Sequence, residues 1–160
     1  MAPAHTFMNT APWQTIPARI VPGFRLASGL NGDPSFPGGT LRMQTPYFRA
    51  LGLDLGCFHP GTVNANIAPR HYRMGRAPHI LRQVKWHPTD PAEDFSFFDC
   101  RLVRDHAPPV AGLIYYPHPE TKPKHFPEPD VLEMILPWID GLGYGTPISL
   151  QVPADQIIIE

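Results

Sequence analysis

Short apolar runs, each closed by proline, glycine or polar turn residues, recur along the chain from Ile16 onward. Runs of this length that are rich in β-branched and aromatic residues are typical of strands. In the segment 58–67 a turn precedes an alternating stretch, in which Val63, Ala65 and Ile67 share one face of a strand. We expect further strands at 18–27 (interrupted at Pro22-Gly23), 80–86, 95–103, 110–116, 148–152 and 156–159, and a strand or short helix at 131–135.

A short helix is predicted at 46–52, where the strand pattern breaks. Thr45 is a favoured N-cap residue, and Pro46 suits the first helical position, where its missing N–H is not needed. Gly52 is a typical helix terminator. Six or seven short strands with one or two short helices therefore predict a mainly β protein, built as a small β-barrel.

Proline is the outlier in composition, with 22 of 160 residues, against a base rate of about 5%. Long helices are disfavoured, because proline in a helix interior costs about 3 kcal/mol. The glycine- and proline-rich segment 29–39 and the polar segment 117–129 predict loops, and loops as long as the second are often functional. The length fits one domain, which we assign to residues 16–160, with residues 1–15 as an N-terminal arm.

Charge and cysteine usage narrow the class of protein. The net charge is −1, so no overall basic field favours nucleic acid or an anionic membrane surface as a partner. No apolar stretch approaches the ~20 residues of a membrane span, and the N-terminus lacks the pattern of a signal peptide. Cys57 and Cys100 show no CxxC spacing, so the sequence indicates neither a disulfide framework nor a zinc knuckle. We expect a cytoplasmic protein whose partners are small molecules.

Three segments carry the functional prediction. The first is the glycine-rich Ala27-Ser-Gly29-Leu30-Asn31-Gly32, and the second is Phe58-His59-Pro60-Gly61-Thr62-Val63-Asn64. The third is Val131-Leu132-Glu133-Met134-Ile135-Leu136-Pro137. In this order and at these separations, the three segments resemble the archaeal-type CTP-dependent riboflavin kinases, over residues 18–153.

The resemblance implies a closed six-stranded cradle-loop barrel that transfers the γ-phosphoryl group of CTP to the 5′-hydroxyl of riboflavin, giving FMN. It implies that Thr62 and Asn64 bind Mg²⁺. It also implies that the glycine-rich loop, with Gly29, Leu30 and Gly32, and the segment after the third motif hold the nucleotide. Glu133, as a candidate catalytic residue, and Thr121, in the loop before it, then contact the flavin.

The residues themselves agree in part with these roles. Gly29 and Gly32 allow backbone N–H groups to approach a polyphosphate, although an ordinary turn uses the same chemistry. Thr62 and Asn64, two apart on a strand, point to the same side and offer the hard oxygen ligands that Mg²⁺ prefers. Their alternative role is to satisfy local backbone groups at a Pro-Gly turn. Glu133 suits a base that orients a hydroxyl, or is a solvated or salt-bridged carboxylate.

Several features separate the chain from the family pattern. The regular Gly-x-Gly-x-Gly run is missing, and Trp138-Ile139-Asp140-Gly141 stands where the family has a Leu-Arg pair. A non-catalytic barrel that binds a flavin or a nucleotide is therefore the alternative function, and a protein-interaction module is a third. None of the eight histidines shows HxH or HExxH spacing, which disfavours zinc, whereas His59 is a candidate substrate contact beside the second motif.

Overall fold

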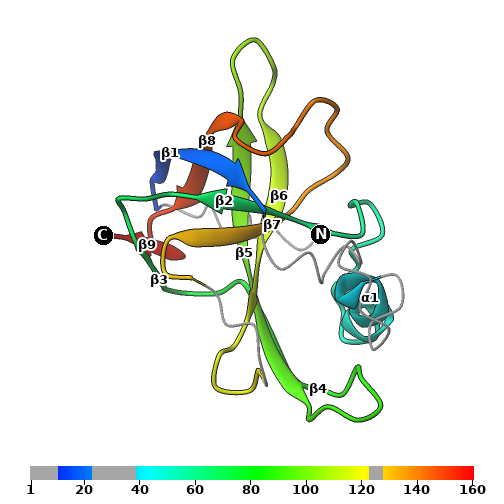
Figure 1. The fold of residues 1–160 in the computed structure, drawn as a ribbon. Helices are drawn as coiled ribbons and strands as arrows, with labels where there is room; N and C mark the ends of the chain where they lie inside the picture. Colours follow the sequence, from blue (N-terminus) through cyan, green and yellow to red (C-terminus); the bar gives the residue numbers. More distant parts are fainter. Residues whose placement is uncertain (1–10, 23–38, 123–127) are drawn as a thin grey trace, which may run out of the picture.

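The computed structural model describes residues 11–22, 39–122 and 128–160, and within these ranges the protein is mainly β (Figure 1). The mainly β prediction is thereby confirmed. The elements, in chain order, are β1 (Trp13–Val21), α1 (Thr40–Ala50), β2 (Thr62–Asn66), β3 (Tyr72–Met74), β4 (His79–Val84), β5 (Glu93–Val103), β6 (Val110–Pro117), β7 (Val131–Ile135), β8 (Pro147–Pro153) and β9 (Ile157–Ile159).

Six strands form a closed ring. The main sheet has the order β4-β5-β6-β7-β2-β1-β8, and a further antiparallel pairing between β5 and β8 joins its two sides. The long strand β5 makes this closure possible, because its first part pairs with β4 and its last residues, 101–103, pair with β8. Strand β4 thus extends beyond the ring, and β3 and β9 form a separate two-stranded sheet.

The ring encloses one apolar core, to which all six strands contribute side chains. Strand alternation explains this arrangement, because every second residue points inward. On β2, Ala65 is buried in this core and Val63 packs against it, and Ile67 follows on the same side, which confirms the predicted face. On β7, Leu132 and Met134 point into the same core. Thr62, Asn64 and Glu133 alternate with these residues and therefore lie on the outer face of the ring.

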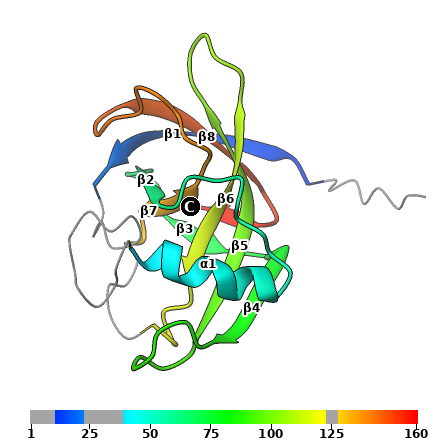
Figure 2. The same cartoon turned by 90° about the vertical axis from the view of Figure 1, so that its right-hand side faces the viewer.

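A second apolar core lies between α1 and the outer face of β4, β5 and β6 (Figure 2). Phe48 of α1 is its centre, with ring centroids 4.9 Å from Phe95 and 5.2 Å from Phe97 in edge-to-face geometry. The phenolic hydroxyl of Tyr115 donates a hydrogen bond of 2.7 Å to the side-chain oxygen of Gln44, which fixes the helix on the sheet. Each aromatic pair stabilises the fold by about 0.5–1.5 kcal/mol beyond its buried area.

The predicted helix exists, but its start was wrong. Helix α1 begins at Thr40, so Pro46 lies inside it and Thr45 is not its cap. The Thr45 hydroxyl instead donates to the Leu41 carbonyl, 2.7 Å away, one turn earlier in the helix. Gly52 ends the helix as predicted, with φ 99° and a backbone N–H that donates to the Arg49 carbonyl.

The strand predictions hold with two corrections. Strand β1 begins at Trp13, inside the segment predicted as an arm, and ends at Val21, whereas residues 23–27 of the predicted strand 18–27 lie outside the described residues. Strand β3 was not predicted. Residues 131–135, for which a strand or a short helix was expected, form strand β7. In the described part of the chain, no helix is long and apolar enough to cross a membrane.

Candidate functional site

Two of the three sequence motifs meet on neighbouring strands. Strands β2 and β7 are antiparallel partners, and their register places Asn64 directly opposite Glu133. The hydroxyl of Thr62 donates a hydrogen bond of 3.2 Å to Oε2 of Glu133. One cluster therefore contains the predicted metal ligands, Thr62 and Asn64, and the predicted catalytic residue, Glu133. Thr62 and Glu133 lie 71 positions apart along the chain.

The oxygen atoms of this cluster fit a hard cation such as Mg²⁺. The side-chain oxygen Oδ1 of Asn64 is buried and has no hydrogen-bond partner among the described residues. A buried acceptor without a partner costs about 1–3 kcal/mol, so its position requires an explanation such as a bound ion. The Thr62 hydroxyl donates its hydrogen bond to Glu133, which leaves the lone pairs of the hydroxyl oxygen available to a cation. Hydroxyl, amide and carboxylate oxygens are the ligands that Mg²⁺ prefers.

Burial and nearby charges set the ionisation of Glu133. Desolvation raises the pKa of its carboxyl above the ordinary value, while the charge of Lys122 and the hydrogen bond from Thr62 act in the opposite direction. Desolvation also lowers the pKa of the Lys122 ammonium group, against the attraction of Glu133 and Glu93. A carboxylate with a raised pKa and a nearby cation is suited to accept a proton from a substrate hydroxyl.

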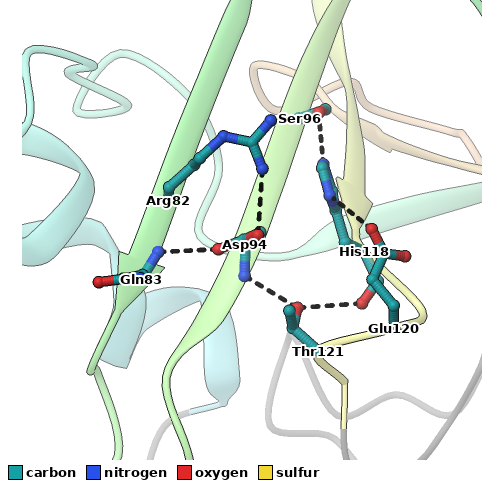
Figure 3. A network of polar contacts seen from close by, with 7 residues as sticks. All are labelled: Arg82, Gln83, Asp94, Ser96, His118, Glu120 and Thr121. Carbon is teal, nitrogen blue, oxygen red and sulfur yellow. Dashed lines mark hydrogen bonds and ion pairs between the residues drawn. The ribbon is translucent and has the colours of Figure 1, made fainter.

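Thr121 is held in the loop before β7 rather than joined to the cluster by a hydrogen bond. Its hydroxyl accepts a bond of 2.9 Å from the backbone N–H of Asp94 and donates one of 3.2 Å to the His118 carbonyl (Figure 3). Asp94 in turn holds the neighbouring strand β4, through an ion pair of 3.2 Å with Arg82 and a bond of 2.8 Å from the backbone N–H of Gln83. This network fixes the start of the loop that carries Lys122.

The same network contains a chain of Ser96, His118 and Glu120. Oγ of Ser96 lies 2.6 Å from Nε2 of His118, and Nδ1 of His118 lies 3.2 Å from Oε1 of Glu120 (Figure 3). The order of groups matches that of a serine nucleophile with its base. Ser96, however, is only 4% exposed on a central strand, so a substrate carbonyl cannot reach its oxygen. We interpret the chain as an anchor for the loop.

A cavity of about 510 Å³ adjoins Thr62 and Asn64 at one end of the ring. This volume lies within the range of about 300–1,000 Å³ that small-molecule sites occupy. His59 lines the cavity, as its predicted role as a substrate contact requires, and its ring centroid lies 5.0 Å from that of Trp138. The remaining lining comes from the end of β1, the start of β2 and the segment 136–144.

Sequence reasoning missed Lys122 as a member of the site and named Trp138 only as a departure from the family pattern. Gly29, Leu30 and Gly32 lie outside the described residues. In the described ranges, no three side chains of histidine, cysteine, aspartate or glutamate converge as metal ligands. Neither a protein-family model nor a curated protein matches the chain.

Proposed function

We propose that the protein is a CTP-dependent riboflavin kinase, which transfers the γ-phosphoryl group of CTP to the 5′-hydroxyl of riboflavin. The observation that carries the proposal is the hydrogen bond of 3.2 Å between Thr62 and Glu133, with Asn64 opposite Glu133 in the register. Phosphoryl transfer needs cation ligands and a hydroxyl-orienting carboxylate side by side, and little other chemistry from the protein. The second and third motifs are distant along the chain, so their contact supports one common site.

Thr62 and Asn64 are the residues that would hold Mg²⁺, through a hydroxyl and an amide oxygen. Bound there, Mg²⁺ would neutralise negative charge on the transferring phosphoryl group. Glu133 accepts the proton of the riboflavin 5′-hydroxyl as that oxygen forms its bond to the γ-phosphorus and the bond to the β-phosphate oxygen breaks, releasing CDP. The Thr62 hydroxyl orients the Glu133 carboxylate, and Lys122 supplies a compensating positive charge.

The proposal also includes a cradle-loop barrel fold and a cytoplasmic location. The closed ring of six strands, with a cavity at one end, supports a cradle-loop barrel whose loops hold the nucleotide. Cys57 and Cys100 are both free thiols, which agrees with a reducing compartment such as the cytoplasm.

A barrel that binds the ligand without catalysis is the second candidate. The observation that favours it is the lining of the cavity, where the described residues include no lysine or arginine to neutralise a polyphosphate. Such a protein would bind a flavin or a nucleotide and leave riboflavin unphosphorylated.

The test is the formation of FMN from riboflavin, CTP and Mg²⁺, followed by chromatography of the flavins. The proposal predicts turnover by the wild type, and a loss of about 10²–10⁴-fold in rate for Glu133→Gln, since general-base catalysis contributes that much. Glu160→Gln is the matched control, because Glu160 is exposed and pairs with Arg73 away from the site. Binding without turnover by the wild type would favour the second candidate instead.

A further inference from the structure

Glu93 is a buried carboxylate that the proposed mechanism does not use. It is the first residue of β5 and is only 4% exposed. Strand alternation places it on the same face as Phe95 and Phe97, which is the face that α1 covers. Its Oε2 accepts a hydrogen bond of 2.8 Å from Nε1 of Trp86. Glutamate is almost never buried to this extent without a partner of opposite charge, so its presence here requires an explanation.

Lys122 is the cation that acts on Glu93. Its charge lowers the pKa of the Glu93 carboxyl, and it lowers that of Glu133 as well. Glu93 lies on β5 and Glu133 on β7, with β6 between these two strands in the sheet. The Lys122 ammonium is therefore attracted by one carboxylate on each side of β6.

Hydrogen bonds to Asp94, the residue after Glu93, fix the backbone that carries Lys122. The backbone N–H of Asp94 donates a bond of 2.9 Å to the Thr121 hydroxyl, and its carbonyl accepts one of 2.9 Å from the N–H of His118 (Figure 3). The N–H of Lys122 donates a bond of 3.0 Å to the His118 carbonyl. The start of β5 and the turn that ends at Lys122 are thus held against each other.

The charge of Glu93 makes the folded state less stable. Desolvation raises the pKa of its carboxyl above the ordinary value of 4.5, and the charge of Asp90 adds to this, against the hydrogen bond from Trp86 and the charge of Lys122. A carboxyl with a raised folded-state pKa destabilises the fold once the pH is high enough to ionise it. Glutamine would keep an acceptor for the Trp86 N–H without this cost, so a structural role alone does not explain the carboxylate.

We propose that Glu93 is a positioning residue, whose charge holds the Lys122 ammonium beside Glu133 at a cost to folding stability. The part of Lys122 in catalysis rests on the proposed function, whereas its attraction to Glu93 does not. When Glu133 accepts the proton of the substrate hydroxyl, it becomes neutral and no longer attracts Lys122. Glu93 keeps its charge during this step, so the ammonium stays in place until Glu133 is ionised again.

The first measurement follows Lys122 itself and needs no substrate. The chain has three lysines, Lys85, Lys122 and Lys124, so ¹³C NMR of protein labelled in its lysine side chains can follow each ammonium group, and Lys122→Met assigns the signal. The pKa of Lys122 should lie below its ordinary value of 10.5 in the wild type and lower still in Glu93→Gln, which removes one attraction. Glu93→Asp, which keeps the charge, should lie closer to the wild type. Glu160→Gln is the matched control, because Glu160 is exposed and pairs with Arg73.

Unfolding and kinetics separate positioning from packing. At neutral pH, Glu93→Gln should unfold at a higher urea concentration than the wild type, because it removes the cost of a buried charge. The same variant should lower kcat for FMN formation by about 10- to 100-fold, with a smaller change in KM, as the loss of a group that orients an active-site residue commonly does. A merely structural Glu93 would give a less stable variant instead.

Three results would overturn the inference: a pKa of Lys122 that is unchanged or raised in Glu93→Gln, a lower urea midpoint for that variant, or an unchanged kcat when the wild type is active. The proposed function is tested separately. The expected response of Lys122 in a protein that forms no FMN supports the attachment of Lys122 to Glu93 and contradicts the kinase. Formation of FMN by a protein whose Lys122 does not respond to Glu93→Gln does the reverse.

Discussion

Two asparagines on β2 offer a sharp comparison, because they differ mainly in whether the amide oxygen has a partner. Oδ1 of Asn64 is buried with no partner among the described residues, whereas Oδ1 of Asn66 accepts a bond of 2.7 Å from the backbone N–H of Ala68. Both side chains lie on the outer face of the ring. Asn64→Leu removes an unpaired buried acceptor, which costs about 1–3 kcal/mol when nothing binds it. Asn66→Leu removes a hydrogen bond worth about 0.5–1.5 kcal/mol.

Without Mg²⁺ we therefore expect Asn64→Leu to be as stable as the wild type or more stable, and Asn66→Leu to be less stable by about 1 kcal/mol. With Mg²⁺ at ten times its Kd, the wild type and Asn66→Leu should each gain about 1.4 kcal/mol, by the linkage between binding and folding. Asn64→Leu should gain nothing.

The assay is urea denaturation followed by tryptophan fluorescence, in EDTA and in Mg²⁺, with the same buffer and ionic strength. Two results would refute the reasoning. One is that Asn64→Leu is as destabilised in EDTA as Asn66→Leu, which would mean that the Asn64 amide has a structural partner. The other is that Mg²⁺ stabilises all three proteins equally, which would place its binding elsewhere.

Three further predictions concern Glu133, Lys122 and Phe48. Because burial raises the pKa of Glu133 above its ordinary value of 4.5, the buried carboxyl favours folding when protonated, and this contribution is lost as the pH rises through the raised pKa. As the pH rises from 4.5, the free energy of unfolding of Glu133→Gln, measured by urea denaturation, should therefore increase relative to that of the wild type. If the difference between the two free energies does not change with pH, the pKa of Glu133 is not raised in the folded protein. Lys122→Met removes a charge that lowers the pKa of Glu133, so the pH at which the rate of FMN formation rises should become higher. An unchanged pH–rate profile would exclude an electrostatic interaction between Lys122 and Glu133. Phe48→Ala should cost about 3–5 kcal/mol in calorimetric or urea unfolding, since it empties the centre of the core between α1 and the sheet; a cost below about 1 kcal/mol would contradict that packing.

The strands could be predicted from the sequence because their signal is local. Alternation placed Val63 and Ala65 inward, and with them Thr62 and Asn64 outward on one face. The start of α1 could not be predicted in this way. Its first turn has no side-chain cap, and Gly39 precedes it with φ 96°. Burial of apolar side chains in the second core supports the six residues before Pro46, and that burial depends on tertiary contacts.

The candidate site shows the same division between local and long-range information. The resemblance named Thr62, Asn64 and Glu133 separately, but only the pairing of β2 with β7 brings them together. Lys122 gave no sequence signal beyond its position after Thr121, because its electrostatic interaction with Glu133 depends on the tertiary structure. Trp138 was visible as a departure from the family pattern, and the cavity beside it supplies the reason to consider it functional.

The most direct test of the kinase is the initial rate of FMN formation from riboflavin, CTP and Mg²⁺ by the wild type, Asn64→Leu and Asn66→Leu. The account predicts that the wild type and Asn66→Leu form FMN at comparable rates, that EDTA abolishes both reactions, and that Asn64→Leu is slower by at least about 10²-fold, as the loss of a ligand to a catalytic metal would cause. No FMN from the folded wild type, or equal rates for Asn64→Leu and Asn66→Leu, would contradict it.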